Sequence, residues 1–257
     1  MSTNGVVLLD ELVGYLASYL RLGEVKDYPA AWNGLQVEGR SEIRRIGAAV
    51  DASVASVDEA VVCSADLLLV HHGLFWDPAR PLVGRGLRRI APLIRNNISV
   101  YASHLPLDAH PEVGNNAGIL RTMGVEPTGQ FGDYQGTLLG FYADIDCHKD
   151  DLLLMLQQAL PSPIRNAFLF GPSRCRRVGV ISGGAGALIA EAKAAGVDFY
   201  ITGEGAQHTY FDARELEINV AYGGHYATET FGVKALAQHL AEQFGIQWMF
   251  LDIPTGL

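Results

Sequence analysis

Five side chains that could bind divalent metal ions stand in three short motifs of this 257-residue chain. The motifs are Val70-His71-His72-Gly73-Leu74-Phe75-Trp76, Ser103-His104-Leu105-Pro106-Leu107-Asp108-Ala109-His110 and Gly223-Gly224-His225-Tyr226-Ala227-Thr228-Glu229. The candidate ligands in them are His71, His72, Asp108, His225 and Glu229. Imidazole nitrogens and carboxylate oxygens without thiolates suit zinc, iron, manganese or nickel, and they do not choose among these metals.

The adjacent histidines follow an apolar run, Asp66–Val70, which predicts a strand that gives way to a loop at His71. Loops at the carboxyl ends of strands commonly carry ligand-binding residues. Because neighbouring side chains of an extended chain point to opposite sides, the pair suits one imidazole for each of two ions. Gly73 would then let the backbone turn away sharply. The alternative is a pair of solvent-facing loop histidines.

The second motif adds a carboxylate. Asp108 could bridge two cations, and Pro106 disfavours a regular helix across His104 and Asp108. His104 and His110 are further candidate ligands, although either could instead lie behind the ligands or on the surface.

The third motif places an imidazole and a carboxylate four residues apart. If a helix begins near Tyr226, His225 and Glu229 project to the same side of its first turn. An exposed capping pair is the alternative. Together the three motifs supply enough ligands for two ions that share a carboxylate and a water molecule.

The elements that must position these residues alternate between strand and helix. In the amino-terminal half the predicted order is Ile43–Val50, Val54–Cys63, Asp66–Val70, Gly86–Arg95 and Ile98–Ala102. In the carboxy-terminal half it is Arg177–Ile181, Ala187–Ala195, Asp198–Ile201 and Ile218–Tyr222. Short β-branched strands separated by helices predict an α/β fold with parallel, βαβ-built sheets.

The two halves can be laid over each other without a gap. Adding 132 to the residue number takes Gly47 to Gly179 and Asp66 to Asp198. Any two βαβ units share the alternation of strand and helix, but that periodicity does not demand matching functional residues. The match therefore predicts an internal duplication.

The duplication also relates the candidate ligands. With an offset of 121, His104 falls on His225 and Asp108 falls on Glu229. With the offset of 132, Glu204 occupies the place of the histidine pair, so we expect Glu204 to face the same cleft as a partner of the ligands.

The duplication predicts two interlinked α/β lobes. The first comprises residues 1–124 and 226–257, and the second comprises residues 125–225, with a small α+β insertion at 133–172. The insertion should contain a strand, a helix and a strand, at Thr137–Asp144, Lys149–Leu160 and Ile164–Phe170. A helix over Thr228–Phe244 and a strand over Gln247–Leu251 should return to the first lobe.

The composition limits the kinds of partner that the protein could bind and the cellular compartment that it suits. The 19 basic and 28 acidic residues give a net charge of -9, which disfavours nucleic-acid binding and is congenial to cations. Cys63, Cys147 and Cys175 are odd in number and widely spaced, which disfavours a disulfide framework or a thiolate zinc site and fits a reducing compartment. No apolar run is long enough to cross a bilayer, and no basic stretch precedes Val6–Leu9 as in a signal peptide. A cytoplasmic protein without membrane association is expected.

Further segments, with the three motifs, carry a resemblance to a known family. They are Tyr28-Pro29, Asn33-Gly34-Leu35-Gln36-Val37-Glu38-Gly39, Gly114-Asn115-Asn116, Ile201-Thr202-Gly203-Glu204 and Leu251-Asp252-Ile253-Pro254. Over nearly its whole length the chain resembles the GTP cyclohydrolase 1 type 2 homologue family, also called the NIF-three-like family. The resemblance implies interlinked α/β lobes with a dinuclear metal site in a cleft, and a homohexameric ring built as a trimer of dimers. It matches the family's metal ligands to His71, His72, Asp108, His225 and Glu229, with His104 near the metals.

The expected function is a metal-dependent hydrolase of a small molecule, in which His104 or Glu204 relays protons. Cyclohydrolase-like attack on a purine ring is one version. The alternative is a non-catalytic metal carrier, insertase or regulatory module, which would have exchangeable metal and a protein partner. A third possibility is that the metals are purely structural, in which case chelation would melt the fold.

Overall fold

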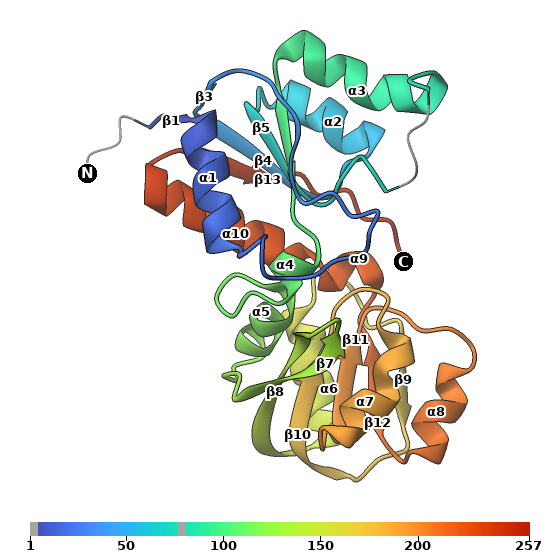
Figure 1. Ribbon diagram of the computed structural model, residues 1–257. Helices are drawn as coiled ribbons and strands as arrows, with labels where there is room; N and C mark the ends of the chain where they lie inside the picture. Colours follow the sequence, from blue (N-terminus) through green and yellow to red (C-terminus); the bar gives the residue numbers. More distant parts are fainter. Residues whose placement is uncertain (1–4, 77–80) are drawn as a thin grey trace. The chain divides into compact units, whose positions relative to one another are not determined.

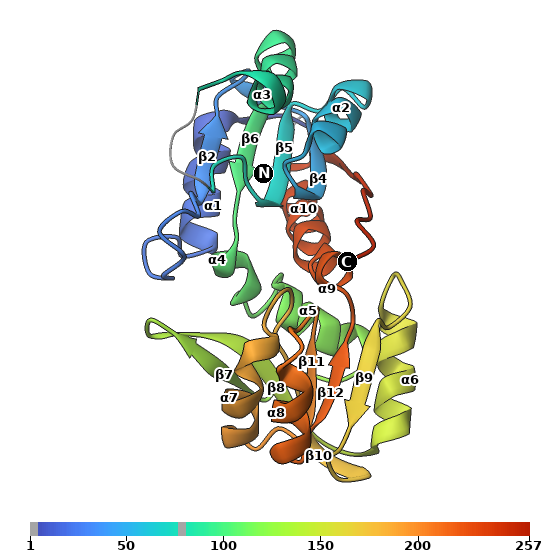
Figure 2. The same ribbon diagram turned by 90° about the vertical axis from the view of Figure 1, so that its right-hand side faces the viewer.

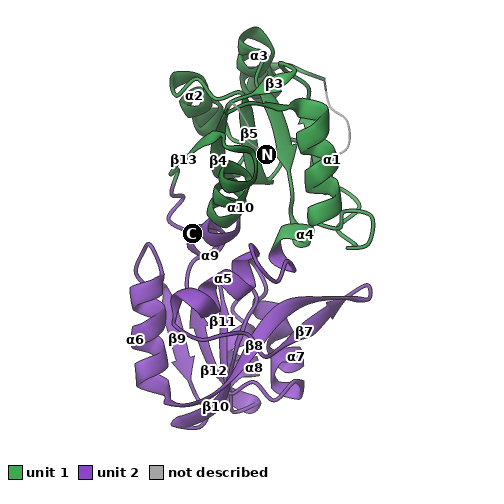
Figure 3. Ribbon diagram, turned by 90° about the vertical axis from the view of Figure 1, so that its left-hand side faces the viewer, with its two compact units in different colours: residues 1–107, 233–253 green, residues 108–232, 254–257 purple. Residues whose placement is uncertain are grey.

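The computed structural model describes residues 5–76 and 81–257, which divide into two compact units (Figure 3). Unit 1 comprises Met1–Leu107 and Val233–Ile253, and unit 2 comprises Asp108–Gly232 and Pro254–Leu257. Each unit has a sheet with helices on both faces, so the predicted α/β fold is confirmed. Residues 1–4 of the segment considered above for a signal peptide lie outside the described residues. None of the described helices is long and apolar enough to cross a membrane.

Unit 1 contains a five-stranded sheet in the order β13-β4-β5-β6-β2. Its strands are β4 (Arg45–Asp51), β5 (Leu67–His72), β6 (Ser99–Ala102), β13 (Gln247–Phe250) and β2 (Gly34–Val37). The first four are parallel, whereas β2 runs antiparallel to β6. The short strands β1 (Val7–Leu8) and β3 (Glu42–Ile43) pair with each other beside it.

The helices of unit 1 cover both faces of this sheet (Figures 1 and 2). On one face, α2 (Val54–Val62) and α3 (Gly84–Asn96) bury an apolar core that includes Val57, Leu93 and Val70. On the other lie α1 (Leu9–Tyr19) and the long α10 (Thr230–Phe244). Helix α2 begins where Ser53 and Ser56 form a reciprocal capping box, which satisfies two backbone N–H groups of its first turn.

Unit 2 contains a six-stranded sheet in the order β7-β8-β10-β11-β12-β9. Its strands are β7 (Gly129–Tyr134), β8 (Thr137–His148), β9 (Asn166–Leu169), β10 (Arg174–Val180), β11 (Phe199–Thr202) and β12 (Asn219–Tyr222). The central β10, β11 and β12 are parallel, and the flanking strands are antiparallel to them or to each other. The two strands of the predicted insertion, β8 and β9, extend this sheet in both directions.

The helices of unit 2 also lie on both faces of their sheet. The helices α5 (Asn115–Thr122) and α6 (Lys149–Ala159) share one apolar core with β8 and β10. The helices α7 (Ile189–Ala194) and α8 (Thr209–Glu215) share another with β11 and β12. A 3-10 turn, η1 (Gly186–Leu188), leads into α7. Two single-turn helices carry candidate site residues: α4 (Leu105–Asp108), of which only Asp108 belongs to unit 2, and α9 (His225–Thr228).

The duplication is visible in matching contacts of two carboxylates. In unit 1 the Asp66 Oδ2 atom accepts the backbone N–H groups of Arg44 and Arg45, at 2.7 and 3.0 Å. In unit 2 the equivalent contacts, at 2.6 and 3.2 Å, join the N–H groups of Arg176 and Arg177 to Asp198 Oδ2. The side chain of the second arginine in each pair also makes the same contact. Arg45 donates Nη1 to the Cys63 carbonyl in unit 1, and Arg177 donates Nη1 to the Ala195 carbonyl in unit 2.

Two predicted elements differ from the observed ones near the candidate site. Strand β5 does not end before the histidines but continues through His72, because His72 pairs with Asp51 of β4. The predicted helix Thr228–Phe244 is divided into the turn α9, which begins at His225, and α10, which begins at Thr230.

Candidate metal centre

The paired histidines lie at the carboxyl end of β5 in unit 1. His71 is fully buried, whereas the His72 side chain is one-fifth exposed. Their ring centroids are only 4.7 Å apart, so the two rings converge where the strand ends rather than pointing to opposite sides as predicted. His104 joins them, and one ligand atom from each of these three residues lies within 4.8 Å of the others.

Each ring of this cluster has one nitrogen held by an oxygen atom of the protein. The pairs are His71 Nδ1 with the Ser103 carbonyl at 2.9 Å, His72 Nδ1 with Asp51 Oδ1 at 3.0 Å and His104 Nδ1 with Asp27 Oδ1 at 2.8 Å. Metal-binding histidines typically donate their second ring N–H to such an oxygen, which fixes both the tautomer and the ring orientation. In this arrangement a metal would be bound through Nε2, so the donor set fits a divalent cation.

Asp27 is a buried anchor that the sequence analysis did not identify. Its Oδ1 atom accepts from the Tyr28 N–H and from His104, and its Oδ2 atom accepts from the Asn33 amide and the Leu105 N–H. The carboxyl side chain is only 6% exposed, so its charge is offset by these donors rather than by water. Asp27 thereby holds the His104 ring and links residues 28–33 to the backbone at Leu105.

Aromatic side chains border the same cluster. The Trp76 ring meets His104 edge-on at 4.9 Å and 88°, and it meets His72 at 5.6 Å and 67°. Tyr28 lies 5.7 Å from the His104 ring. His72 and His104 therefore pack against aromatic side chains.

The carboxylate of Asp108 is held within unit 2. It is 7% exposed, and its Oδ1 atom accepts from the Asn115 amide at 2.8 Å and the Ser182 hydroxyl at 3.1 Å. Asn115 also accepts the Gly232 N–H at 2.6 Å through its amide oxygen. Asp108 is therefore fixed by residues from separate parts of the unit 2 chain.

The segment that leads to Asp108 differs from the prediction. Pro106 was expected to prevent a regular helix, but Leu105–Asp108 forms the single turn α4. Proline is tolerated there because the first turn of a helix does not use its backbone N–H groups. The nearby His110 accepts the backbone N–H groups of Glu112 and Val113 through Nδ1, at 3.2 Å each, and so shapes a turn.

His225 in unit 2 lies between two carboxylates. Its Nε2 atom is 3.1 Å from Glu229 Oε1, and its Nδ1 atom is 2.9 Å from Glu204 Oε1. Glu229 is buried, whereas the Glu204 side chain is about half exposed. Burial lowers the pKa of His225, but the hydrogen bond and charge of Glu229, followed by those of Glu204, outweigh it and raise the pKa to about 9.

A glycine makes room for this group. Gly183 has a φ of +65°, and a Cβ atom there would clash with Glu229 Oε1 and lie 3.3 Å from His225 Nε2. The N–H of Gly183 donates to the Thr228 hydroxyl at 3.0 Å, so its backbone packs directly against α9. Nothing in the sequence pattern distinguishes this glycine from an ordinary turn residue.

The predicted site residues thus form well-defined groups within each unit. Unit 1 brings together His71, His72 and His104. Unit 2 brings together Glu204, His225 and Glu229, and separately anchors Asp108.

Comparisons with known proteins agree with this architecture. The model of the family described as Duf34/NIF3 (NGG1p interacting factor 3) matches residues 7–256. A relative from Deinococcus radiodurans, described as a GTP cyclohydrolase 1 type 2 homolog, is 44% identical over 256 residues, which cover 98% of this chain and 96% of the relative. A relative of the same description from Archaeoglobus fulgidus is 43% identical, over 97% of this chain and 99% of its own.

Solved structures give the same result. TTHA1606 from Thermus thermophilus matches with a TM-score of 0.88 at 39% identity, over 98% of this chain and 100% of its own. The protein ybgI, described as of unknown function, matches with a TM-score of 0.89 at 34% identity, also over 98% of this chain and 100% of its own.

Proposed function

Because the chain belongs to the Duf34/NIF3 family, we propose that it is a hydrolase that depends on two divalent metal ions. One observation carries this proposal, the cluster of His71, His72 and His104 with its ligand atoms within 4.8 Å of one another. Three histidine rings held by oxygen atoms in this way are typical of metal sites.

We assign the metal ligands to His71, His72, Asp108, His225 and Glu229. Each of these five side chains contacts a neighbour in its own unit. The buried acids Asp108 and Glu229 would supply the negative charge that compensates two dications. His104 and Glu204 would then act beside the ligands rather than as ligands.

Divalent cations act as Lewis acids and lower the pKa of water, which supplies the nucleophile for a hydrolase at neutral pH. Glu204 is exposed enough to meet a substrate, and its bond to His225 gives it a route for a proton. His104, with its Nδ1 held by Asp27, can move a proton through Nε2. The relatives described as GTP cyclohydrolase 1 type 2 homologs make hydrolysis at a purine ring one version of this reaction.

The proposal is tested by loading the purified chain with zinc, manganese, iron or nickel and measuring metal content and turnover. We expect two equivalents of metal, and turnover on a panel of nucleotides and phosphoesters that is lost in Asp108→Ala. Asp58→Ala, at an exposed position of α2, is the matched control and should retain turnover. If the loaded protein shows no turnover on a broad panel, the hydrolase proposal is wrong. Rapid metal exchange would then favour the non-catalytic carrier, insertase or regulatory module.

We further propose a cytoplasmic homohexamer built as a trimer of dimers. The family resemblance supports the assembly, and exposed apolar side chains such as Trp32 and Val83 are available for contacts between copies. Three free thiols, Cys63, Cys147 and Cys175, fit a reducing compartment. Light scattering after size-exclusion chromatography should give six times the mass of one chain, and a monomer would contradict the proposed assembly.

A further inference from the structure

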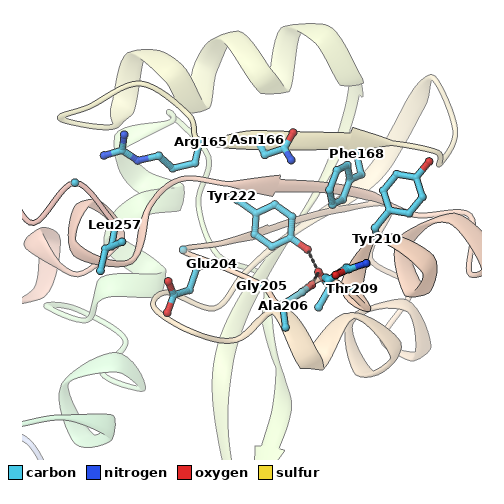
Figure 4. A pocket seen from close by; sticks show the side chains of 13 residues that line it. Arg165, Asn166, Phe168, Glu204, Gly205, Ala206, Thr209, Tyr210, Tyr222 and Leu257 are labelled. Atoms are coloured by element: carbon cyan, nitrogen blue, oxygen red, sulfur yellow. Dashed lines mark hydrogen bonds between the residues drawn. The ribbon is translucent and has the colours of Figure 1, made fainter.

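Unit 2 contains a pocket of about 490 Å³ at the carboxyl ends of β11 and β12 (Figure 4). One wall comes from Arg165 to Phe168, at and just before β9, and another from the loop at residues 203–207 and the start of α8. Small-molecule sites typically have volumes of about 300–1,000 Å³. In open α/β sheets such sites lie at the carboxyl ends of the parallel strands, as this pocket does.

The inner end of the pocket is aromatic and firmly held. The Phe168 ring meets Tyr210 edge-on at 5.0 Å and 87°, and it meets Tyr222 at 5.6 Å and 75°. The Tyr222 hydroxyl is fixed 2.7 Å from Thr209 Oγ1, which itself donates to the Ala206 carbonyl. A planar ring could pack here without reorganising the wall, which reduces the entropic cost of binding.

The outer end of the pocket is polar and carries a cation. Figure 4 shows the Arg165 guanidinium directed away from the aromatic side chains. None of the ion pairs among residues 5–76 and 81–257 involves Arg165, although the chain as a whole is acidic, with a net charge of -9. An exposed guanidinium at the end of an aromatic pocket suits an anionic substituent, and phosphate and carboxylate are its best-matched partners.

Further side chains with hydrogen-bonding groups line the pocket. Asn166 and Gln207 contribute carboxamides, and Glu204 contributes a carboxylate. Glu204 uses Oε1 for His225, and Oε2 has no hydrogen bond within the described chain. A carboxylate accepts hydrogen bonds only, so it favours a ring that presents N–H groups.

We propose that this pocket binds a nucleoside monophosphate, with its base against Phe168, Tyr210 and Tyr222 and its phosphate at Arg165. The base would then meet Glu204, the residue that contacts His225. This inference names the substrate class of the proposed hydrolase and rests on that function for its catalytic meaning. Binding itself requires only residues of unit 2 and no metal.

The test is calorimetric titration of the full chain, freed of metal by chelation, with guanosine 5′-monophosphate, guanosine and ribose 5-phosphate. We expect the monophosphate to bind and each fragment to bind at least tenfold more weakly. Arg165→Gln should weaken monophosphate binding about tenfold and leave guanosine binding unchanged. Tyr210→Ser should weaken both base-containing ligands about five- to hundredfold. Arg214→Gln, at an exposed arginine of α8, is the control and should bind as the wild type does.

Two results would overturn the inference. One is the absence of monophosphate binding to the folded, metal-free chain at millimolar concentration. The other is binding that neither Arg165→Gln nor Tyr210→Ser changes. Failure of the hydrolase proposal would look different, because the metal-loaded protein would then bind the monophosphate through these residues without turning it over.

Discussion

Replacement of Asp27 by asparagine tests whether this one carboxylate holds the His104 ring and the chain around it. The four donors to Asp27 are divided equally, with Tyr28 and His104 on Oδ1, and Asn33 and Leu105 on Oδ2. Asparagine has nearly the same shape but only one acceptor oxygen. In either orientation, two of the four donors would face an amide NH₂ group instead of an acceptor.

The size of the effect follows from these two lost bonds. A buried donor left without an acceptor costs about 1–3 kcal/mol. Asparagine also removes the cost of burying a charge, so we expect a net loss of about 2–4 kcal/mol in the free energy of unfolding. For a chain of this size that corresponds to a fall in Tm of about 4–16 °C. Asp58→Asn, on the exposed side of α2, is the control and should change stability by less than about 0.5 kcal/mol.

The effect should depend on pH. Burial raises the pKa of Asp27, but the hydrogen bond and charge of His104, with the bonds from Asn33 and Tyr28, hold that pKa below its ordinary value of 3.8. A carboxylate with a lowered folded-state pKa contributes stability above the unfolded pKa and loses that contribution as the pH falls through the folded pKa. The difference between wild type and Asp27→Asn should therefore be largest at neutral pH and shrink below about pH 4.

Urea unfolding followed by circular dichroism measures the stability, and turnover by the metal-loaded chain measures the positioning role. We expect turnover to fall about ten- to hundredfold, because the His104 ring loses part of the contact that orients it for proton transfer. An asparagine variant as stable as the Asp58→Asn control would refute the hydrogen-bond reasoning. A destabilised variant with unchanged turnover would show that Asp27 supports the fold but does not position His104 for proton transfer.

Three further predictions concern unit 2. In metal-free protein, NMR titration should give His225 a pKa of about 9, and Glu229→Gln should lower it; an unchanged value would contradict the assigned cause. Gly183→Ala should destabilise the chain by about 1–2 kcal/mol in urea unfolding, because residue 183 has a φ of +65° and the new Cβ atom would meet Glu229. The control Gly14→Ala, where a Cβ atom has open space, should be neutral or stabilising. Asp198→Ala should cost about 1–3 kcal/mol because it removes the oxygen that accepts the backbone N–H groups of Arg176 and Arg177 in β10, and a loss no larger than that of Asp58→Ala would argue against this role.

Much of the fold follows from periodicity in the sequence. The β-branched runs and the offset of 132 predict two βαβ units, and the matching roles of Asp66 and Asp198 give that offset a physical basis. Element boundaries were less predictable, because pairing decides them. His72 belongs to β5 because β4 continues far enough to pair Asp51 with it, which the local sequence does not reveal.

The candidate ligands were recognisable because their residue types are unusual at strand and helix ends. The residues that orient them were not recognisable, because their roles depend on contacts between distant segments. Asp27 is 77 residues from His104, and Ser182 is 74 residues from Asp108. The pocket beside Glu204 was missed for the same reason, since Phe168 and Tyr210 read as ordinary core aromatics until β9 and α8 bring them together.

The two copies of the repeat hold an imidazole in the same way but obtain the supporting carboxylate differently. His104 and its counterpart His225 each have Nδ1 bonded to a carboxylate, from Asp27 in unit 1 and from Glu204 in unit 2. Asp27 lies outside the repeated segment, whereas Glu204 stands where unit 1 has His72. The change from histidine to glutamate therefore removes a nitrogen donor from the second copy and supplies the acceptor that its remaining ring needs. Divergence after duplication has left three imidazoles together in unit 1 and one imidazole between two carboxylates in unit 2. The two copies therefore differ in charge and in the metal chemistry that each can support.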